Sequence, residues 1–111
     1  MNIQIFGTSK SADTRKAQRF FKERGIRFQF IDMKQKGMSR GEFNSVLKAV
    51  GGVEAMLDGD ARDADALALV RYIYDKEDKL YENQQVIKLP VVRNGSRATV
   101  GYQPDVWKTW Q

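Results

Sequence analysis

The fold is decided by residues 2–32, which read NIQIFGTSKSADTRKAQRFFKERGIRFQFID. The segment 2–6 is rich in β-branched and aromatic residues and predicts a strand, and the alternation in 26–32 predicts a second strand. Between them, apolar residues recur at helical spacing over 12–24, and Gly25 provides a C-terminal stop for that helix. The short connections make a βαβ unit, whose strands should be parallel and whose crossover should be right-handed.

The remainder of the chain predicts helices followed by a hairpin. Apolar spacing indicates three helices, at 39–50, 59–74 and 76–87. The first of these opens with SRGE, the form of a capping box. Two short strands within 89–102 are joined by Asn94-Gly95, a strong hairpin signal, and a last helix begins at Pro104.

These elements predict an α/β protein of one domain over residues 1–111. The order is βαβ, a helical insert at about 36–87, and ββα, which is the thioredoxin-like order of elements. We expect a mixed four-stranded sheet flanked by helices. The order alone leaves other small α/β sheets open.

Two residue types are missing from the chain, and their absence limits its chemistry. There is no cysteine, which excludes disulfides, thiolate metal sites and thiol redox chemistry by the protein itself. There is no histidine, so the commonest general base and metal ligand is missing as well. We therefore expect no catalytic residue, no metal site and no cofactor.

Positive charge is concentrated in the first half of the chain. Residues 1–48 hold eleven Lys and Arg against four acidic residues, a net +7, whereas residues 49–111 hold eight against ten, a net −2. This asymmetry could steer an acidic partner. No apolar stretch approaches the roughly 20 residues of a membrane helix, and no secretory signal is visible, so the expected location is cytoplasmic and no membrane contact is expected.

The loop between the first strand and the first helix is the candidate functional site. It could be a reaction centre, an anion cradle or only a helix start. A helix N-terminus favours anions, and Lys10, Arg15 and Lys16 add positive charge, while Ser11 and Thr14 offer hydroxyls. A hydroxyl nucleophile needs a positioned base, and no GxSxG or SxxK pattern in this loop supplies one. The simplest reading is that Ser11 or Asp13 caps the helix.

Three segments resemble the arsenate reductase and Spx-like proteins. SADTRKAQRFFKERGIRFQFID (11–32) resembles their Cys-x-x-Cys or Cys-x-x-Ser, Arg-Lys-Ala, helix, Gly-Ile and aromatic strand. KLPVV (88–92) resembles their Arg-Pro-Val-Val, whose proline has a cis peptide bond beside the cysteine loop. VGYQPDVW (100–107) is similar to their C-terminal segment. Ser11 matches the reactive cysteine of the family, and Thr14 matches the second cysteine.

The resemblance implies the thioredoxin-like fold, and it implies a cis bond at Leu89-Pro90. It does not imply the activity, because both cysteine positions carry hydroxyl residues and Leu89 replaces the arginine before the proline. In the enzymes, that cysteine attacks the arsenic oxyanion and arginines hold it. A serine hydroxyl has no comparable ionisation or redox ladder.

Other features have simpler explanations. The aspartates of 58–65 suit the start of a helix better than a calcium site, because the glycine and the terminal glutamate of an EF-hand are missing. The basic helix within 15–27 has an apolar face and no recognition motif, so direct nucleic acid binding is not expected. Trp107 and Trp110 should pack on the sheet, and one of Tyr72 and Tyr74 should remain accessible.

Two functions follow from the sequence. The first is a redox-inactive, cysteine-less protein that acts as a non-catalytic interaction or regulatory domain. RNA polymerase is the partner that the Spx resemblance implies. The alternative is an oxyanion- or glutathione-binding protein with residual glutathione-dependent reductase activity. Its ligand would be a small anion or glutathione, and its candidate binding residues are Lys10, Ser11, Thr14, Arg15, Leu89 and Pro90.

Overall fold

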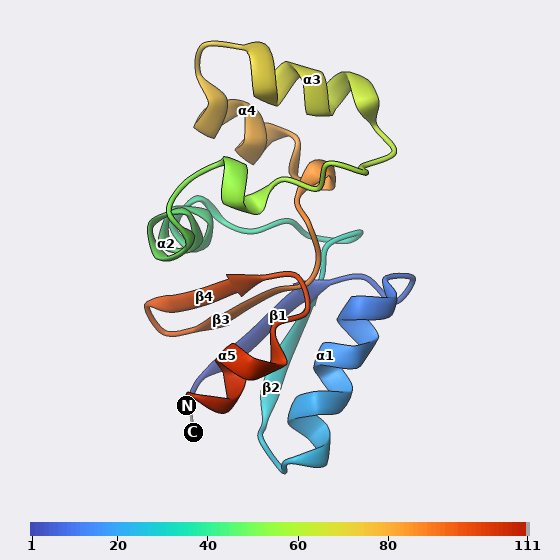
Figure 1. The fold of residues 1–111 in the computed structure, drawn as a ribbon, viewed down its shortest axis with the longest axis vertical. Helices are drawn as coiled ribbons and strands as arrows, with labels where there is room; N and C mark the ends of the chain where they lie inside the picture. Colours follow the sequence, from blue (N-terminus) through green and yellow to red (C-terminus); the bar gives the residue numbers. More distant parts are fainter. Residues whose placement is uncertain (111) are drawn as a thin grey trace.

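The computed structural model describes residues 1–110 and contains a mixed four-stranded sheet of order β2-β1-β3-β4 (Figure 1). The strands are β1 (Ile3–Gly7), β2 (Phe28–Asp32), β3 (Val91–Asn94) and β4 (Arg97–Val100). The helices are α1 (Ala12–Glu23), α2 (Arg40–Val50), α3 (Ala64–Tyr72), α4 (Lys76–Glu82) and α5 (Pro104–Lys108). Two short 3-10 turns lie at η1 (Glu54–Met56) and η2 (Gln84–Val86).

The βαβ unit predicted from residues 2–32 is present. Strands β1 and β2 are parallel, and their register runs from Ile3 opposite Phe28 to Gly7 opposite Asp32. Helix α1 makes the crossover between them. Strand β1 also pairs antiparallel with β3, and β3 pairs antiparallel with β4, so the sheet is mixed as expected. This confirms the thioredoxin-like arrangement and places the start of α1 beside the beginning of β3.

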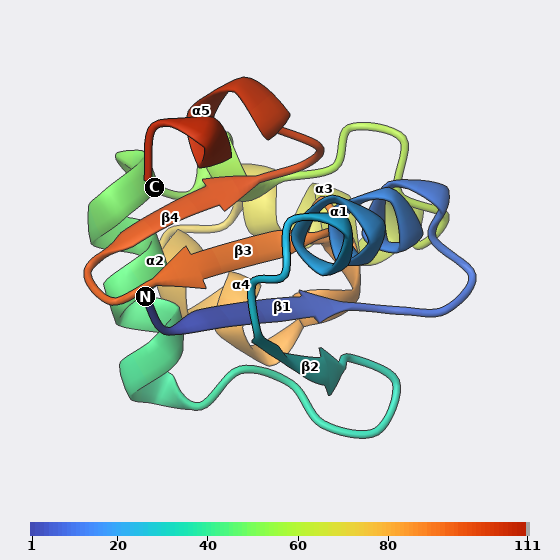
Figure 2. The ribbon, with the colours of Figure 1, turned by 90° about the horizontal axis from the view of Figure 1, so that it is seen from below.

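Each face of the sheet has its own hydrophobic core, because successive side chains of β1 point to opposite faces. Ile3 and Ile5 pack under α1 and α5, with the buried aromatic residues of those helices. Phe6 points the other way and packs against α2 and the rest of the insert. Figure 2 shows α1 and α5 together on the near face of the sheet, with α2, α3 and α4 behind it.

The indole of Trp107 is fully buried beneath the sheet, as expected for a packing residue. Its Nε1–H donates to the hydroxyl of Thr99 at 2.7 Å, so the one polar group of the ring has a partner. The ring also makes edge contacts with Phe20, at 5.3 Å between centroids. Trp110 is buried as well, which confirms the packing role predicted for both tryptophans.

The insert packs on the sheet through α2, and one side-chain clamp ties the two ends of the insert to each other. The backbone N–H of Met38 donates to Gln84 Oε1 at 2.7 Å, and Gln84 Nε2 donates to the carbonyl of Met38 at 3.1 Å. Gly37 makes this possible, because a Cβ there would lie 2.8 Å from the same amide oxygen. The clamp joins the entry of the insert, before α2, to its exit at η2.

The capping box predicted from SRGE is present at the start of α2. The hydroxyl of Ser39 accepts from the N–H of Glu42 at 3.2 Å, and the carboxylate of Glu42 accepts from the N–H of Ser39 at 2.8 Å. Burial works against the charged form of Glu42, but the bonds to Ser39 and the charges of Arg93 and Lys36 outweigh it. The pKa of Glu42 is therefore lowered from 4.5.

The helix predicted at 59–74 is shorter than expected. It runs only over Ala64–Tyr72 and is capped by Asp63, while the acidic residues before it form a loop. Ile73 and Tyr74 continue the apolar spacing of the predicted helix, but neither packs as part of it. Ile73 has left the helix with φ −97° and ψ 153°, and Tyr74 is fully exposed. Tyr72 is exposed as well, so both tyrosines are accessible and not one.

The hairpin is present, but its turn lies one residue later than the sequence suggested. Asn94 still pairs with Arg97, so the two turn residues are Gly95 and Ser96. Gly95 has φ 61° and the other turn residue has a negative φ, which fits a type II′ turn with glycine first. Within residues 1–110, no helix combines the length and the apolar character needed to cross a bilayer.

Candidate functional site at the start of helix α1

Ser11 is the residue that caps helix α1. It has φ −77° and ψ 118°, and its hydroxyl accepts from the N–H of Thr14 at 3.1 Å. Its carbonyl accepts the first intrahelical bond, from the N–H of Arg15 at 3.1 Å. This geometry is that of an N-cap, and it assigns to Ser11 the role that the sequence left open between Ser11 and Asp13. The hydroxyl is engaged as an acceptor for the backbone.

Thr14 is fully buried and faces the sheet. A Cβ on Gly7 would lie 2.4 Å from both Oγ1 and Cγ2 of Thr14, so Thr14 fills the space that the glycine leaves. Its Oγ1 is buried without a hydrogen-bond partner among the described residues. Thr14 therefore contributes packing where α1 meets β1, and its hydroxyl is closed to any ligand in solvent.

Arg15 and Lys10, the two cations nearest to Ser11 in the sequence, differ in their contacts. Arg15 is exposed, and its Nη1 donates to the carbonyl of Ser9 at 2.6 Å, which ties the helix back to the loop before it. Lys10 is exposed at the tip of that loop. Lys10 and Arg15 lie in the same turn as Ser11, but the residues that surround the Ser11 side chain come mostly from the insert and from the segment before β3.

A hollow of about 450 Å³ lies beside Ser11. It is lined by Ser11, Ala12, Asp13, Asp58, Asp60, Gln85, Ile87, Lys88 and Leu89. Three carboxylates face a single ammonium group in this lining, which opposes the binding of an oxyanion. Within residues 1–110, no group of three or more His, Cys, Asp or Glu side chains is arranged to hold a metal ion.

A fourth carboxylate, that of Asp63, is bonded to Gln85, a residue that lines this hollow. Its oxygens accept from the N–H of Ala66 at 3.0 Å and from Nε2 of Gln85 at 3.1 Å. These bonds lower the pKa of Asp63 below its usual value, so its carboxylate stays charged to a more acidic pH than that of an aspartate without such bonds. This part of the surface is therefore acidic because carboxylates from the start of α1 and from the insert come together there.

The peptide bond Leu89-Pro90 is cis, as the resemblance implied. Pro90 is buried, and its carbonyl accepts from the N–H of Gly101 at 2.9 Å. Leu89 is half-buried and lines the hollow beside Ser11. Of the six candidate binding residues, the structure thus brings Ser11 and Leu89 together. The lining of this hollow leaves out the other four, Lys10, Thr14, Arg15 and Pro90.

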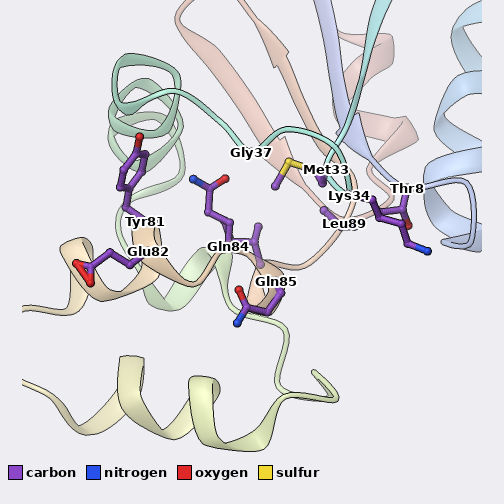
Figure 3. Close-up of a pocket in the computed structure, with 10 residues that line it drawn as sticks. Thr8, Met33, Lys34, Gly37, Tyr81, Glu82, Gln84, Gln85 and Leu89 are labelled. Atoms are coloured by element: carbon purple, nitrogen blue, oxygen red, sulfur yellow. The ribbon is translucent and has the colours of Figure 1, made fainter.

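Leu89 also borders a second cavity, of about 510 Å³, between the sheet and the insert (Figure 3). It is lined by Thr8, Met33, Lys34, Gly37, Tyr81, Glu82, Gln84, Gln85, Ile87 and Leu89. Figure 3 shows Tyr81, Glu82 and Gln84 along the insert side and Thr8 and Lys34 at the opposite end. The volume is within the range of small-ligand pockets.

Sequence reasoning missed this cavity and the aspartates beside Ser11. The aspartates were visible in the sequence as a cluster at 58–65, and the DGD pattern there is a turn signal. The position of these aspartates next to α1 could not be predicted from the sequence, because it depends on how the insert returns to the sheet. The bridge between Leu57 and Ile87 and the bond from the N–H of Asp58 to the carbonyl of Val86 fix that return.

The two hydroxyls of the assembled site, those of Ser11 and Thr14, are both used by the fold. Its hydroxyls are a helix cap at Ser11 and a buried packing residue at Thr14, and neither has an imidazole or thiol to activate it. Its open surface is a pair of hollows on the two sides of Leu89, one acidic and one largely apolar. Such a surface is suited to contact with another molecule.

Comparison with known proteins confirms the resemblance. The chain is 25% identical over 113 aligned residues to the global transcriptional regulator Spx 2 of Oceanobacillus iheyensis, and the match covers 95% of this chain and 80% of that protein. No family model matches the chain. The sequence similarity is thus to an Spx regulator and is spread over nearly the whole domain.

Solved structures share the fold over nearly their full lengths. An arsenate reductase from Vibrio cholerae superposes with a TM-score of 0.79 at 22% identity, covering 96% of this chain and 94% of that one. A protein from Bacteroides fragilis, described as related to the ArsC family, gives a TM-score of 0.82 at 14% identity and covers 100% and 98%. At these identities the match establishes the fold: thioredoxin-like, of the arsenate reductase and Spx type.

Proposed function

We propose that this protein is a redox-inactive, non-catalytic interaction domain that acts by binding another protein. The observation that carries the proposal is the environment of Ser11, the position of the reactive cysteine in the proteins it resembles. Its hydroxyl caps α1, and the hollow beside it presents three carboxylates and one lysine. A site that held an arsenic oxyanion would need the opposite balance of charge.

The partner class we infer is RNA polymerase. The support is the similarity to a protein named as a global transcriptional regulator, which extends over 95% of this chain. In the Spx-like proteins that the sequence resembles, the cysteine pair is a sensor, so a chain without it is expected to bind without redox control. Regulation would then depend on the amount of protein.

Purified RNA polymerase from the source organism provides the test. The polymerase is immobilised, the protein is passed over it at physiological salt, and the bound amount is measured with and without dithiothreitol. We expect saturable binding that is the same under both conditions, because no thiol is present to be switched. Absence of saturable binding to the polymerase, together with no protein recovered above background from extract of the same cells, would contradict the proposal.

A second candidate function rests on the cavity beside Leu89. Its size suits glutathione, and Lys34, one of the residues that line it, offers an ammonium group to a carboxylate of the tripeptide. Any reductase activity would then require glutathione to supply both the attacking thiol and the electrons. Titration with glutathione, arsenate or phosphate, followed by amide shifts, tests this candidate. No shift at Thr8, Lys34 or Leu89 at millimolar ligand removes it.

A further inference from the structure

A groove of about 500 Å³ lies between helices α1 and α5, on the face of the sheet opposite the insert (Figure 2). Its cations are Lys16, Arg19, Arg24 and Lys108, its carboxylate is Glu23, and Tyr102 forms part of its wall. Four positive charges and one negative charge therefore line it. None of these side chains borders the hollows beside Leu89.

Arg24 is held in place before any ligand arrives. The centre of its guanidinium lies 3.7 Å from the centroid of the Phe20 ring, and its Nη1 donates to the carbonyl of Phe20 at 3.1 Å. Phe20 is itself fixed by edge contacts with Phe21 and Trp107, at 5.0 and 5.3 Å between centroids. Because this bond uses one of the five N–H donors of the arginine, the others remain for a ligand. Ordering the side chain in advance lowers the entropic cost of binding.

The other cations are only weakly engaged within the protein. Lys16 Nζ is 3.9 Å from Asp13 Oδ1 and Lys108 Nζ is 3.8 Å from Asp105 Oδ1, and all four side chains are substantially exposed. Exposed pairs of this kind contribute little and exchange readily. In the part of the chain that the structure describes, no carboxylate oxygen lies within 4.0 Å of the guanidinium of Arg19 or of Arg24.

The wall of the groove offers apolar surface next to this charge. Tyr102 is 40% exposed, and its ring packs edge-on against Trp107 at 5.6 Å between centroids. Lys16 Nζ stands 5.6 Å from the centroid of the same ring. An ordered aromatic ring beside exposed cations is typical of surfaces that bind peptides, because tyrosine gives large contact area with little loss of freedom.

We propose that this groove binds an acidic peptide segment of a protein partner, through Arg19, Arg24 and Lys108. The proposal rests on the proposed function, since it names the surface and the chemistry by which the domain binds protein. A peptide fits better than nucleic acid, because Asp13, Glu23 and Asp105 interrupt the positive surface. Separate carboxylates can avoid them, whereas a continuous phosphate backbone would be repelled.

A direct titration tests the groove without the natural partner. The probe is a fluorescein-labelled peptide of Glu-Asp-Leu repeats, and its anisotropy is followed as the protein is added. We expect saturable binding that weakens as salt is raised, and at least about tenfold weaker binding of the matched Gln-Asn-Leu peptide. Amide shifts should fall in α1 and α5. No binding, equal binding of both peptides, or shifts confined to other elements overturns the proposal, and so does tighter binding of duplex DNA of equal charge.

Charge reversal on the groove provides the matched comparison. Arg19→Glu and Lys108→Glu change exposed residues, and each should weaken the acidic peptide at least about fivefold. Lys48→Glu makes the same change in net charge on α2, across the sheet, and should leave affinity within about twofold. Equal loss in all three variants would show an effect of net charge alone and would overturn the assignment. Thermal melts confirm that each variant is folded.

The same variants separate this inference from the proposed function. If wild-type protein binds the polymerase and Arg19→Glu does not, while Lys48→Glu does, the groove is the contact surface. If all three bind equally, the proposed function stands and the groove is not the surface used. If the wild type binds no protein partner, the proposed function fails, and the peptide titration still decides whether the groove binds acidic segments.

Discussion

Ser11 and Thr14 belong to one turn of helix, yet the structure gives their hydroxyls opposite surroundings. The hydroxyl of Ser11 caps the helix and borders an open hollow, whereas that of Thr14 is buried with no partner. A buried donor without a partner costs stability, so Thr14 carries a polar group at a position that favours an apolar one. By the resemblance drawn from the sequence, Ser11 matches a reactive cysteine and Thr14 a position that can hold a second one, and here the two hydroxyls have different structural roles.

Thr14→Val replaces the unpaired hydroxyl with a methyl group of similar size. We expect the free energy of unfolding to rise by about 1 kcal/mol or more, because the desolvation cost of the hydroxyl is removed. Urea denaturation followed by circular dichroism measures it. The control is Thr14→Ser, which keeps the hydroxyl, loses the packed methyl and should be less stable than wild type. A loss of stability in Thr14→Val would show that the hydroxyl has a partner.

Ser11→Cys places a thiol at the position that the resemblance matches to the reactive cysteine of the arsenate reductase and Spx-like proteins. A helix N-terminus lowers the pKa of a thiol, but the carboxylates of Asp13, Asp58 and Asp60 raise it, so we expect an apparent pKa above about 7.5. The pH dependence of iodoacetamide alkylation gives the value, with Ser96→Cys in the hairpin turn as the exposed reference. Adding Asp13→Asn and Asp58→Asn should lower the pKa. A pKa well below 7 without those changes would contradict the charge assignment of the hollow.

At this scale, local sequence predicted part of the site. Ser11 as a cap follows from its residue type and its place before a helical pattern, and the cis bond at Leu89 followed from the resemblance. The approach of Asp58 and Asp60 to Ser11 could not be predicted. It depends on a contact between segments about 47 residues apart, which the local pattern does not encode.

Among the elements, helix ends that carry a local sequence signal were predicted well. Helix ends that are determined by tertiary packing were not. The capping box at Ser39 placed the start of α2, and the glycine pair after Val50 placed its end, with Gly51 at φ 92°. Helix α3 ends at Tyr72 although its apolar spacing continues to Tyr74. Helix α3 ends where the chain turns into α4, and the exposed side chain of Tyr74 shows that the spacing of apolar residues alone does not determine burial.

Glu42→Gln tests the cap of α2 through its pH dependence. The pKa of Glu42 is lower in the folded protein than its reference of 4.5, so its contribution to stability is present above that reference and is lost as pH falls through the folded value. Unfolding free energies measured from neutral to acidic pH should therefore fall less steeply for Glu42→Gln than for wild type. Glu54→Gln, at an exposed position, should follow the wild-type curve. Parallel curves for wild type and Glu42→Gln would contradict this assignment.

Gln84→Ala tests the clamp between the two ends of the insert. It removes both hydrogen bonds to Met38 and leaves a partly buried N–H without its partner, so we expect a loss of about 1 to 3 kcal/mol in unfolding free energy. Hydrogen exchange should show faster exchange of the Met38 amide. Gln85→Ala, which removes an exposed bond to Asp63, should leave that amide protected. Unchanged protection in Gln84→Ala would mean that the clamp does not hold the insert.

In the whole molecule, the two faces of the sheet are suited to different tasks. The apolar hollow lies on the face with the insert, and the acidic hollow lies where the start of α1 meets the insert. The face with α1 and α5 carries the basic groove. The sequence predicted the excess charge of the first half and the thioredoxin-like order of elements. It could not show that the cations of α1 would meet Lys108 across a groove, because that depends on where α5 docks on the sheet.

The central claim is that this thioredoxin-like domain carries out no redox chemistry, and one assay tests it most directly. Purified protein is incubated with arsenate, glutathione and a glutaredoxin, and arsenite is measured over time beside a cysteine-containing arsenate reductase. We predict a rate equal to that of the protein-free mixture, because the chain has no cysteine thiol to attack arsenate and pass on the electrons of glutathione. Saturable production of arsenite by the wild-type protein that is abolished by Ser11→Ala would contradict the account.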